Sequence, residues 1–446
     1  MKTILRALLA LMPLSIGMAC LVLCAALTLP VPANADGPAP AQSKILHSDR
    51  TELGDDIAHY RYDVTMGPGK YDVVRIHRVV RERRPNKPVS TRDAVMLLPG
   101  NPNTFEGAFM APMVTGVSDL DHSIVIFLAK NDIDDWGMDY GWALVPPDET
   151  DFEFMGQWGL AKDVAHAEAA LSFVRSIRVG TGQGNGKLHV LGFSYGGLVA
   201  YPLVGEETLQ PPGLRNVKGM IALDFGVKLG NAAEREFYCA MAVNDQALLE
   251  SDPPNSYANG TGLFFQELAN LASTEPDAES PYFSPLTNWQ APLFIGASTE
   301  FLTGQFWHFV GGYLDEGGIP SGLRFTDDQL WVGVMGAIPP YYPVRIDVDG
   351  DQVLCGTFDT PFDDHLAQIT VPILHVGAKG GFGPSAYAST TLTASRDVTT
   401  ITVQRLSDAD EVMDFGHGDT VLAREAETLV WRPILNWITA HRENRP

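Results

Sequence analysis

The chain has 446 residues, of which 45% are hydrophobic and 19% are charged, so it can bury a large core and form two or three folding units. Its formal net charge is −23, with 54 acidic residues against 31 basic ones. The acids are spread along the chain and Lys and Arg form no long run, which argues against nucleic acid as a partner.

The first 35 residues predict a secretory signal peptide. A basic opening, MKTILR, precedes the almost wholly apolar run 7–29, and Ala33-Asn34-Ala35 has the small-residue pattern of a cleavage site. We therefore expect cleavage after Ala35 and a secreted or periplasmic protein without stable membrane association. An uncleaved N-terminal membrane anchor is the alternative, because the apolar run is longer than an average signal core.

Two of the four cysteines, Cys239 and Cys355, remain after this cleavage. Export places both thiols in an oxidising compartment, where they can pair. We expect a disulfide between them, and two buried free thiols are the alternative.

The mature chain begins with a Pro-, Ala- and Gly-rich stretch, 36–48, which is typical of a flexible leader. Two segments that alternate apolar and polar residues follow, at 59–66 and 71–80. Gly67-Pro68-Gly69 between them favours a turn, so the pair predicts an antiparallel hairpin.

From residue 94 the pattern changes to short apolar runs that alternate with helical spacing. We expect buried strands at 94–100, 123–129, 187–192 and 217–224, and helices at 163–174 and 195–204. Strands that alternate with helices predict a parallel sheet with right-handed crossovers.

The alternation stops near residue 225 and resumes near residue 370. We expect strands at 371–377 and 398–406, a small helix at 384–392 and a final helix at about 420–441. The predicted division is a core in two parts, 49–226 and 369–446, with a mainly helical cap, 227–368, inserted between them.

A candidate nucleophile lies in Gly192-Phe193-Ser194-Tyr195-Gly196, between a predicted strand and a predicted helix. This is the context of a nucleophile elbow, a turn so tight that the residues two before and two after the serine must be very small. The helix N-terminus beside Ser194 favours developing negative charge. An ordinary strand-to-helix turn is the alternative.

A serine hydroxyl needs a base, which the chain order Ser, acid, His places after the last strand. Among the 11 histidines, His417 fits, since it lies between two glycines in a loop before the final helix. His189 and His375 lie inside expected strands, and His122 and His308 have no supporting context. A solvent-exposed loop histidine is the alternative for His417.

The acid that orients this imidazole should lie at the carboxyl end of a strand. The segment after the penultimate strand, AKGGFGPS, has no carboxylate, but strand 217–224 ends in Asp224, one crossover from Ser194. We assign the acid role to Asp224, with Asp414 as the reserve candidate. A helix-capping or loop aspartate is the alternative for Asp224.

An oxyanion hole requires backbone N–H groups that point at the developing charge. We expect one from Tyr195, which follows the nucleophile, and one from Asn101 in the turn Pro99-Gly100-Asn101-Pro102. Gly100 permits close backbone approach, and an ordinary Pro/Gly loop is the alternative.

Together these residues resemble the α/β-hydrolase superfamily, over about 94–225 and 370–441. The resemblance implies an α/β fold with an eight-stranded, mostly parallel sheet flanked by helices, and a Ser-His-Asp mechanism. It departs from the commonest pattern in lacking an acid after the penultimate strand. The expected function is hydrolysis of a carboxylic ester or lactone with an apolar part, through an acyl-enzyme.

Other functions remain open at this point. The same residues serve amidases, peptidases and C–C bond hydrolases, and a non-catalytic binding protein on a hydrolase scaffold is an alternative of another class. We expect no cofactor and no metal, since no His/Cys cluster has zinc spacing. The oligomeric state does not follow from the sequence.

Aromatic and apolar residues near the expected site are candidates for the substrate pocket. Trp136 and Met138 follow the predicted strand 123–129 and either line the pocket or pack in the core. The same two interpretations apply to an aromatic cluster in the cap, namely Phe301, Phe306, Trp307 and Phe309.

Overall fold

The computed structural model describes residues 44–183, 186–299 and 306–442. The predicted signal peptide, 1–35, and most of the predicted leader, 36–48, lie outside these residues. The strands of the central sheet are β1 (Ile45–Gly54), β2 (Ile57–Thr65), β3 (Val73–Arg84), β4 (Lys87–Pro88), β5 (Ala94–Leu98), β6 (Asp134–Asp139), β7 (Leu188–Phe193), β8 (Val217–Leu223), β13 (Ile373–Ala378) and β14 (Val398–Val403).

The central sheet has ten strands in the order β1-β2-β3-β6-β5-β7-β8-β13-β14, with β4 paired to β3. Neighbours from β6 to β14 along this order are parallel, whereas the strands from β1 to β4 pair antiparallel. A mostly parallel sheet and the 59–66/71–80 hairpin, now β2 and β3, are therefore confirmed. The sheet has two strands more than the eight predicted. Two strands are hard to recognise in the sequence: β1 begins at Ile45, inside the predicted leader, and β4 is only two residues long.

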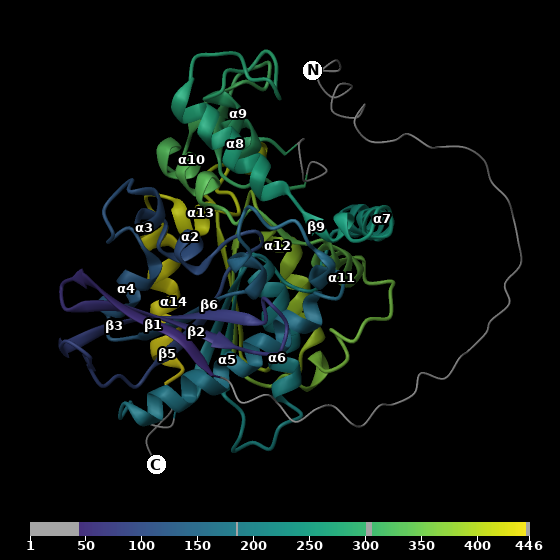
Figure 1. The fold of residues 1–446 in the computed structure, drawn as a ribbon. Helices are drawn as coiled ribbons and strands as arrows, with labels where there is room; N and C mark the ends of the chain where they lie inside the picture. The colour runs from purple at the N-terminus through teal and green to yellow at the C-terminus, as the bar shows by residue number, and fades with distance from the viewer. Residues whose placement is uncertain (1–43, 184–185, 300–305, 443–446) are drawn as a thin grey trace, which may run out of the picture.

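Helices cover both faces of this sheet (Figure 1). The α-helices outside the segment between β8 and β13 are α2 (Phe105–Phe109), α3 (Ala111–Thr115), α4 (Ile124–Lys130), α5 (Leu160–Gly180), α6 (Tyr195–Glu207), α12 (Gly383–Ala386), α13 (Asp419–Leu422) and α14 (Arg432–Ala440). Successive residues of a strand face opposite sides, and β5 illustrates this. Leu97 shares one core with α4 and α14, and Met96 shares the other with α5 and α6.

The prediction of a strand at 123–129 was wrong. This run forms α4, and the strand that follows it is β6, with the sequence DDWGMD. A short, wholly apolar run has no periodicity and fits a buried helix as well as a buried strand. Two of the three buried carboxylates of β6 have charged or polar partners: Asp134 bonds Arg78 and Arg178, and Asp139 bonds His77. The third, Asp135, has no hydrogen-bond partner among the described residues.

The final helix also differs from the prediction of a helix at about 420–441. It is interrupted, with α13 ending at Leu422 and α14 beginning at Arg432 after a π-helical turn at Glu427–Trp431. The predicted small helix at 384–392 is present as α12 followed by a 3₁₀ helix.

The segment between β8 and β13 is mainly helical in its described part. Its α-helices are α7 (Ala232–Leu249), α8 (Thr261–Thr274), α9 (Gln290–Ala297), α10 (Asp328–Ala337) and α11 (Val344–Cys355). In Figure 1, α8, α9 and α10 lie together at one end of the molecule, near α13. Within the described residues, no helix has both the length and the apolar character that a membrane span requires.

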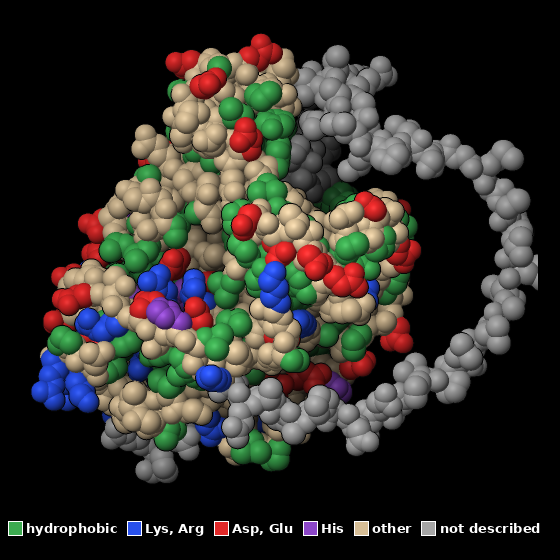
Figure 2. All heavy atoms as spheres, in the orientation of Figure 1, with side chains coloured by type: hydrophobic (Ala, Val, Ile, Leu, Met, Phe, Trp, Pro, Cys, Tyr) green, Lys and Arg blue, Asp and Glu red, His purple; other side chains and the backbone are tan. Residues whose placement is uncertain are grey.

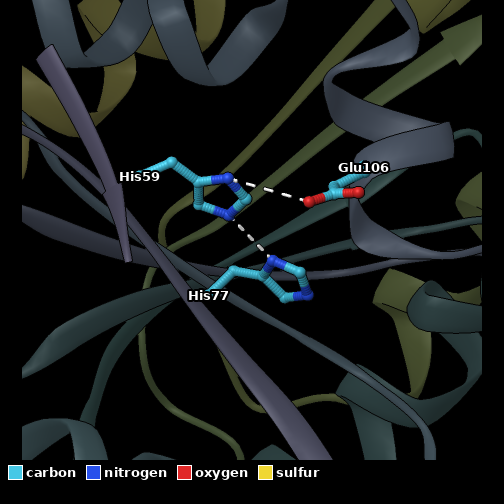
Figure 3. A group of neighbouring side chains, drawn as sticks. All are labelled: His59, His77 and Glu106. Carbon is cyan, nitrogen blue, oxygen red and sulfur yellow. Dashed lines mark hydrogen bonds and ion pairs between the residues drawn. The ribbon is translucent and has the colours of Figure 1, made fainter. Parts of the chain in front are cut away.

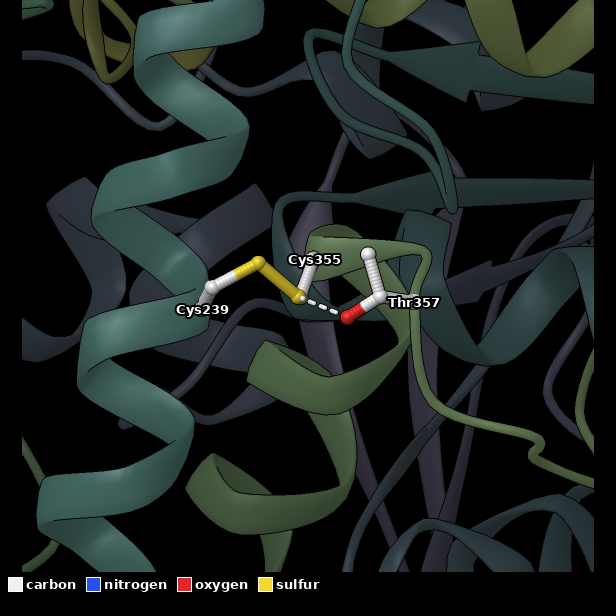
Figure 4. Close-up of a disulfide and its surroundings, with 3 residues drawn as sticks. All are labelled: Cys239, Cys355 and Thr357. Carbon is white, nitrogen blue, oxygen red and sulfur yellow. Dashed lines mark hydrogen bonds between the residues drawn. A yellow bond between two sulfur atoms is a disulfide. The ribbon is translucent and has the colours of Figure 1, made fainter. Parts of the chain in front are cut away.

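The predicted disulfide is confirmed: Cys239 on α7 is bonded to Cys355 at the end of α11 (Figure 4). The two helices pack side by side, and the bond closes a loop with a sequence separation of 116 residues. In the chain-entropy model, a crosslink over a loop of this length raises the free energy of unfolding by about 5 kcal/mol.

The acidic side chains are spread over the face of the molecule that Figure 2 shows and do not gather in a single patch. Basic side chains lie among them. This distribution agrees with the sequence, in which the acidic excess is distributed along the chain.

Candidate active site

Ser194 lies at the turn between β7 and α6, at the carboxyl end of the parallel strands. Its φ and ψ angles are 56° and −128°, so a residue with a side chain is held in a backbone region that normally favours glycine. The strained turn presents the side chain at the edge of the sheet and places it at the N-terminus of α6.

The glycines around Ser194 are required by close packing. A Cβ atom on Gly192 would lie 2.1 Å from the carbonyl oxygen of Gly196, and one on Gly196 would lie 2.0 Å from the carbonyl oxygen of Leu98. Neither position tolerates a side chain without moving backbone. The spacing of the two glycines that marked this motif in the sequence therefore has a direct steric cause.

Asp224 and His417 are brought together although 193 residues separate them. The Nδ1 atom of His417 lies 2.8 Å from Oδ2 of Asp224, and both side chains are buried. A carboxylate can only accept, so Nδ1 carries the proton and Nε2 is left free to accept one. This pairing lets the carboxylate stabilise an imidazolium.

The loop after β13 has no carboxylate of its own, and instead it binds the carboxylate of Asp224, the residue that follows β8. Backbone N–H groups of Ala378 and Gly383 donate to Oδ1 of Asp224, at 2.7 and 2.8 Å, and that of Phe382 donates to Oδ2 at 3.2 Å. A Cβ on Gly381 would lie 2.1 Å from Oδ2. The glycine-rich sequence therefore wraps the loop around the carboxylate.

The reserve candidate, Asp414, has a different place. Its Oδ1 accepts from the backbone N–H groups of Arg405 and Phe415, at 2.8 and 2.7 Å, and so closes its own loop. Its Oδ2 is buried without a hydrogen-bond partner in the described residues. Asp414 shapes the loop that carries His417 and does not bond the imidazole.

A short part of the segment between β8 and β13, residues 306–310, fixes the His417 loop. The backbone N–H of His417 donates to the carbonyl of His308 at 3.0 Å, and the N–H of His308 donates to the carbonyl of Gly380 at 3.0 Å. The buried His308 ring also bonds the carbonyl of Asp414 through Nε2, at 2.7 Å. These residues thus join the loop that carries His417 to the loop that holds Asp224.

Aromatic rings enclose the imidazole of His417. The Phe193 ring stacks on it with centroids 4.8 Å apart, and the rings of Phe382 and Trp307 lie at 5.2 and 5.4 Å. The Nε2 atom is buried and has no hydrogen-bond partner among the described residues. Because nucleophile–base hydrogen bonds often form fully only with substrate bound, this free atom, which shares a cavity with Ser194, can serve as a base.

The turn after β5 packs directly against the serine. A Cβ on Gly100 would lie 2.6 Å from the Cβ of Ser194, which explains the glycine at this position. Asn101, the next residue, lines the same cavity as Ser194. Tyr195 is the first residue of α6, so its N–H has no acceptor within the helix. Both predicted oxyanion residues therefore lie beside the serine.

The sequence interpretation missed a chain of buried polar groups beneath this turn. His59 Nε2 lies 2.9 Å from His77 Nδ1, and His59 Nδ1 lies 3.7 Å from the Glu106 carboxylate (Figure 3). His77 continues to Asp139, 3.1 Å away, whose other oxygen accepts from the N–H of Phe105 at 2.6 Å. This series of contacts links α2, which follows the turn 99–102, to β2, β3 and β6.

Of the described residues, only His59, His77 and Glu106 form a group that could hold a metal ion. The two nitrogens of His59, however, face different partners across the ring (Figure 3), and Nε2 already bonds Nδ1 of His77 at 2.9 Å. Because a metal would have to break this bond, a hydrogen-bonded pair of imidazoles with a nearby carboxylate describes the group better than a metal site.

A second missed feature is a buried carboxylate that bonds the side chain of Tyr195, next to Ser194 in the chain. Asp163 on α5 accepts from the Tyr195 hydroxyl at 2.8 Å and from the indole N–H groups of Trp142 and Trp158 at 3.1 and 2.9 Å. Burial raises the pKa of Asp163 to about 6. The network anchors the side chain of Tyr195, which is the residue that follows Ser194.

A narrow cavity of about 80 Å³ opens at Ser194 and His417. Its walls come from the turn 99–102 after β5 and from the helices α2, α8, α9, α10 and α13. Phe309 of the predicted cap cluster lines it, and Phe301 lies outside the described residues.

Trp136 and Met138 are not among the residues that line this cavity. Both side chains are fully buried in the core that contains α5 and α6. Their position follows from the corrected strand: residues 136 and 138 of β6 face the same side of the sheet, where Trp136 packs against Arg78 and Tyr62. They act as core residues, which was the other interpretation of the sequence.

No family model and no curated protein matches the sequence. Among solved structures, one from Sulfolobus solfataricus, provisionally described as a lipase, aligns with a TM-score of 0.62 at 18% identity, over 89% of this chain and 100% of the other. Juvenile hormone epoxide hydrolase from the silkworm Bombyx mori aligns at 14% identity, over 87% and 80%, with a TM-score of 0.40. An epoxide hydrolase from Vigna radiata aligns at 11% identity, over 86% and 98%, with a TM-score of 0.43.

Proposed function

Because the chain has the α/β-hydrolase fold, we propose that it is a serine hydrolase that cleaves a carboxylic ester or lactone through an acyl-enzyme intermediate. The observation that carries the proposal is the bond between Asp224 and His417, beside a serine held at a strained elbow. Each of the three residues comes from a different strand end, so their convergence is a property of the fold.

In the first half of the reaction, His417 Nε2 takes the proton of Ser194 Oγ, which attacks the substrate carbonyl. The N–H groups of Tyr195 and Asn101 stabilise the oxyanion. Asp224 keeps the proton on Nδ1 and stabilises the imidazolium. Because aromatic rings enclose His417, these electrostatic interactions act in a poorly hydrated site, where they are stronger than in water.

The tetrahedral intermediate then collapses and the alcohol leaves with the proton from His417. A water molecule, deprotonated by the same Nε2 atom, attacks the acyl group on Ser194. Collapse of the second tetrahedral intermediate releases the carboxylic acid and returns the proton to Ser194.

The cavity supports an ester or lactone with an apolar part. Among the described residues, no Asp, Glu, Lys or Arg side chain lines it, so a charged substrate group would lose its hydration without gaining a partner there. Epoxide hydrolysis is disfavoured by the nucleophile itself. Attack by Ser194 on an epoxide carbon would form an ether, which water does not cleave by an acyl-enzyme route, whereas a carboxylate nucleophile forms a cleavable ester.

A substrate panel tests this proposal. The purified mature protein is incubated with short-chain esters, γ- and δ-lactones, matched anilides, a 1,3-diketone and a styrene-type epoxide. We expect the highest kcat/KM for an ester or lactone. Preferred cleavage of the anilide or diketone would move the function to an amidase or a C–C bond hydrolase. No turnover, together with no labelling of Ser194 by a fluorophosphonate, would favour a binding protein.

We also propose that the chain is exported to an oxidising compartment. The disulfide between Cys239 and Cys355 supports this, because such bonds persist mainly outside the cytosol. The sequence of residues 1–35 supports it independently.

A further inference from the structure

One face of helix α10 forms a wall of the cavity at Ser194. Trp331, Val334, Met335 and Ile338 all line it. The spacing of Val334 and Met335, three and four residues from Trp331, places these three on a single side of the helix, and Ile338 follows directly after its end. All four side chains are buried, although α10 lies in the inserted segment at the outer end of the molecule (Figure 1).

The polar groups of the cavity are confined to one end. They belong to Asn101, Asn103, Ser194 and His417, and the other described residues of the lining are glycine, proline or apolar side chains. A bound molecule must therefore place its reacting carbonyl at this end and an uncharged, apolar group along α10.

The size of the cavity limits that group. A dry apolar cavity of about 150 Å³ holds one benzene molecule, so a cavity of about 80 Å³ leaves room for roughly three carbon atoms beyond the carbonyl. A longer acyl chain must extend beyond this cavity.

On the basis of the proposed function, we propose that the α10 face is the acyl-binding wall of the site and selects short acyl groups of about four carbons. The acyl part fits this place better than the alcohol part. The alcohol must leave before water attacks, whereas the acyl group stays bound to Ser194 through both steps.

The test is an acyl-chain series of p-nitrophenyl esters, from acetate to dodecanoate, on the wild type and on Met335→Ala. The wild type should have its highest kcat/KM near butyrate. The variant, which loses the three outer heavy atoms of a buried side chain, should shift this maximum by about two carbons. Each methylene newly buried should raise kcat/KM about fourfold.

The matched control is Val332→Ala, on the same helix. Val332 is buried but does not line the cavity, so its truncation loosens the packing of α10 without enlarging the acyl site. Its chain-length profile should remain that of the wild type. A parallel series of butyrate esters with alcohols of increasing length should change kcat/KM less than the acyl series does.

The outcomes separate the two proposals. If the wild type cleaves no ester, the proposed function fails. If it cleaves esters but Met335→Ala keeps the wild-type profile, or Val332→Ala shifts it equally, the acyl wall is refuted. A profile that follows the alcohol length instead of the acyl length also overturns the assignment. If Met335→Ala does not fold, the chain-length dependence of Ser194 labelling by alkyl fluorophosphonates on the wild type decides instead.

Discussion

Substitution of Ser194 by alanine is expected to lower kcat by about 10⁶-fold against the best ester found in the panel. The reason is that Ser194 carries the only hydroxyl among the described residues that line the cavity, so the variant keeps only the oxyanion hole and substrate binding. Alanine keeps the Cβ atom and the same backbone requirement, so the strain at φ 56° is unchanged. The free energy of unfolding should therefore change by less than about 1 kcal/mol.

The measurement compares steady-state kinetics and urea unfolding of wild type and variant. Ser176→Ala, at an exposed position of α5, controls for loss of a serine hydroxyl elsewhere and should be fully active. Comparable activity of Ser194→Ala and wild type would contradict the assignment of the nucleophile.

Substitution of Asp224 by asparagine is expected to lower kcat by about 10⁴-fold, because the hydrogen bonds around Asp224 fix the orientation of the new amide group. The Oδ1 position accepts from two backbone N–H groups, so the asparagine oxygen takes that place. The NH₂ group then occupies the Oδ2 position and faces Nδ1 of His417. His417 must turn to the other tautomer to accept this bond, which places its proton on Nε2 and leaves it unable to act as a base.

Asp414→Asn is the matched comparison. Its oxygen can keep both bonds of Oδ1, and its NH₂ group falls at Oδ2, which has no partner in the described residues. We expect kcat to stay within about threefold of the wild type. The opposite ranking of the two variants would transfer the acid role to Asp414.

The sequence was sufficient for the parts of the site that depend on topology and backbone sterics. The glycines around Ser194 mark the elbow because any side chain there would collide with backbone. The segment after β13, where the acid is more commonly found, has no carboxylate. Asp224 could still be identified as the acid candidate, because neighbouring parallel strands end at the same edge of the sheet. The structure adds that the loop after β13 supplies the N–H donors for that same carboxylate.

The parts that could not be predicted depend on tertiary partners. The β6 sequence, DDWGMD, looks too polar for a central strand until Arg78 and Arg178 are seen beside Asp134. The placement of Trp136 and Met138 required the register of β6, which the mistaken strand at 123–129 concealed. The face of α10 that lines the cavity has ordinary helical spacing, and nothing in that spacing says whether a helix covers a core or a substrate.

The central claim is that Ser194 carries the acyl group, and it is tested most directly by trapping the acyl-enzyme. The protein is mixed with p-nitrophenyl butyrate, quenched with acid within milliseconds, and its peptides are analysed by mass spectrometry. We predict a butyryl group on the peptide that contains Ser194, formed in step with a burst of p-nitrophenol. Turnover of the ester with no acyl group on Ser194, or with one on another residue, would contradict the account.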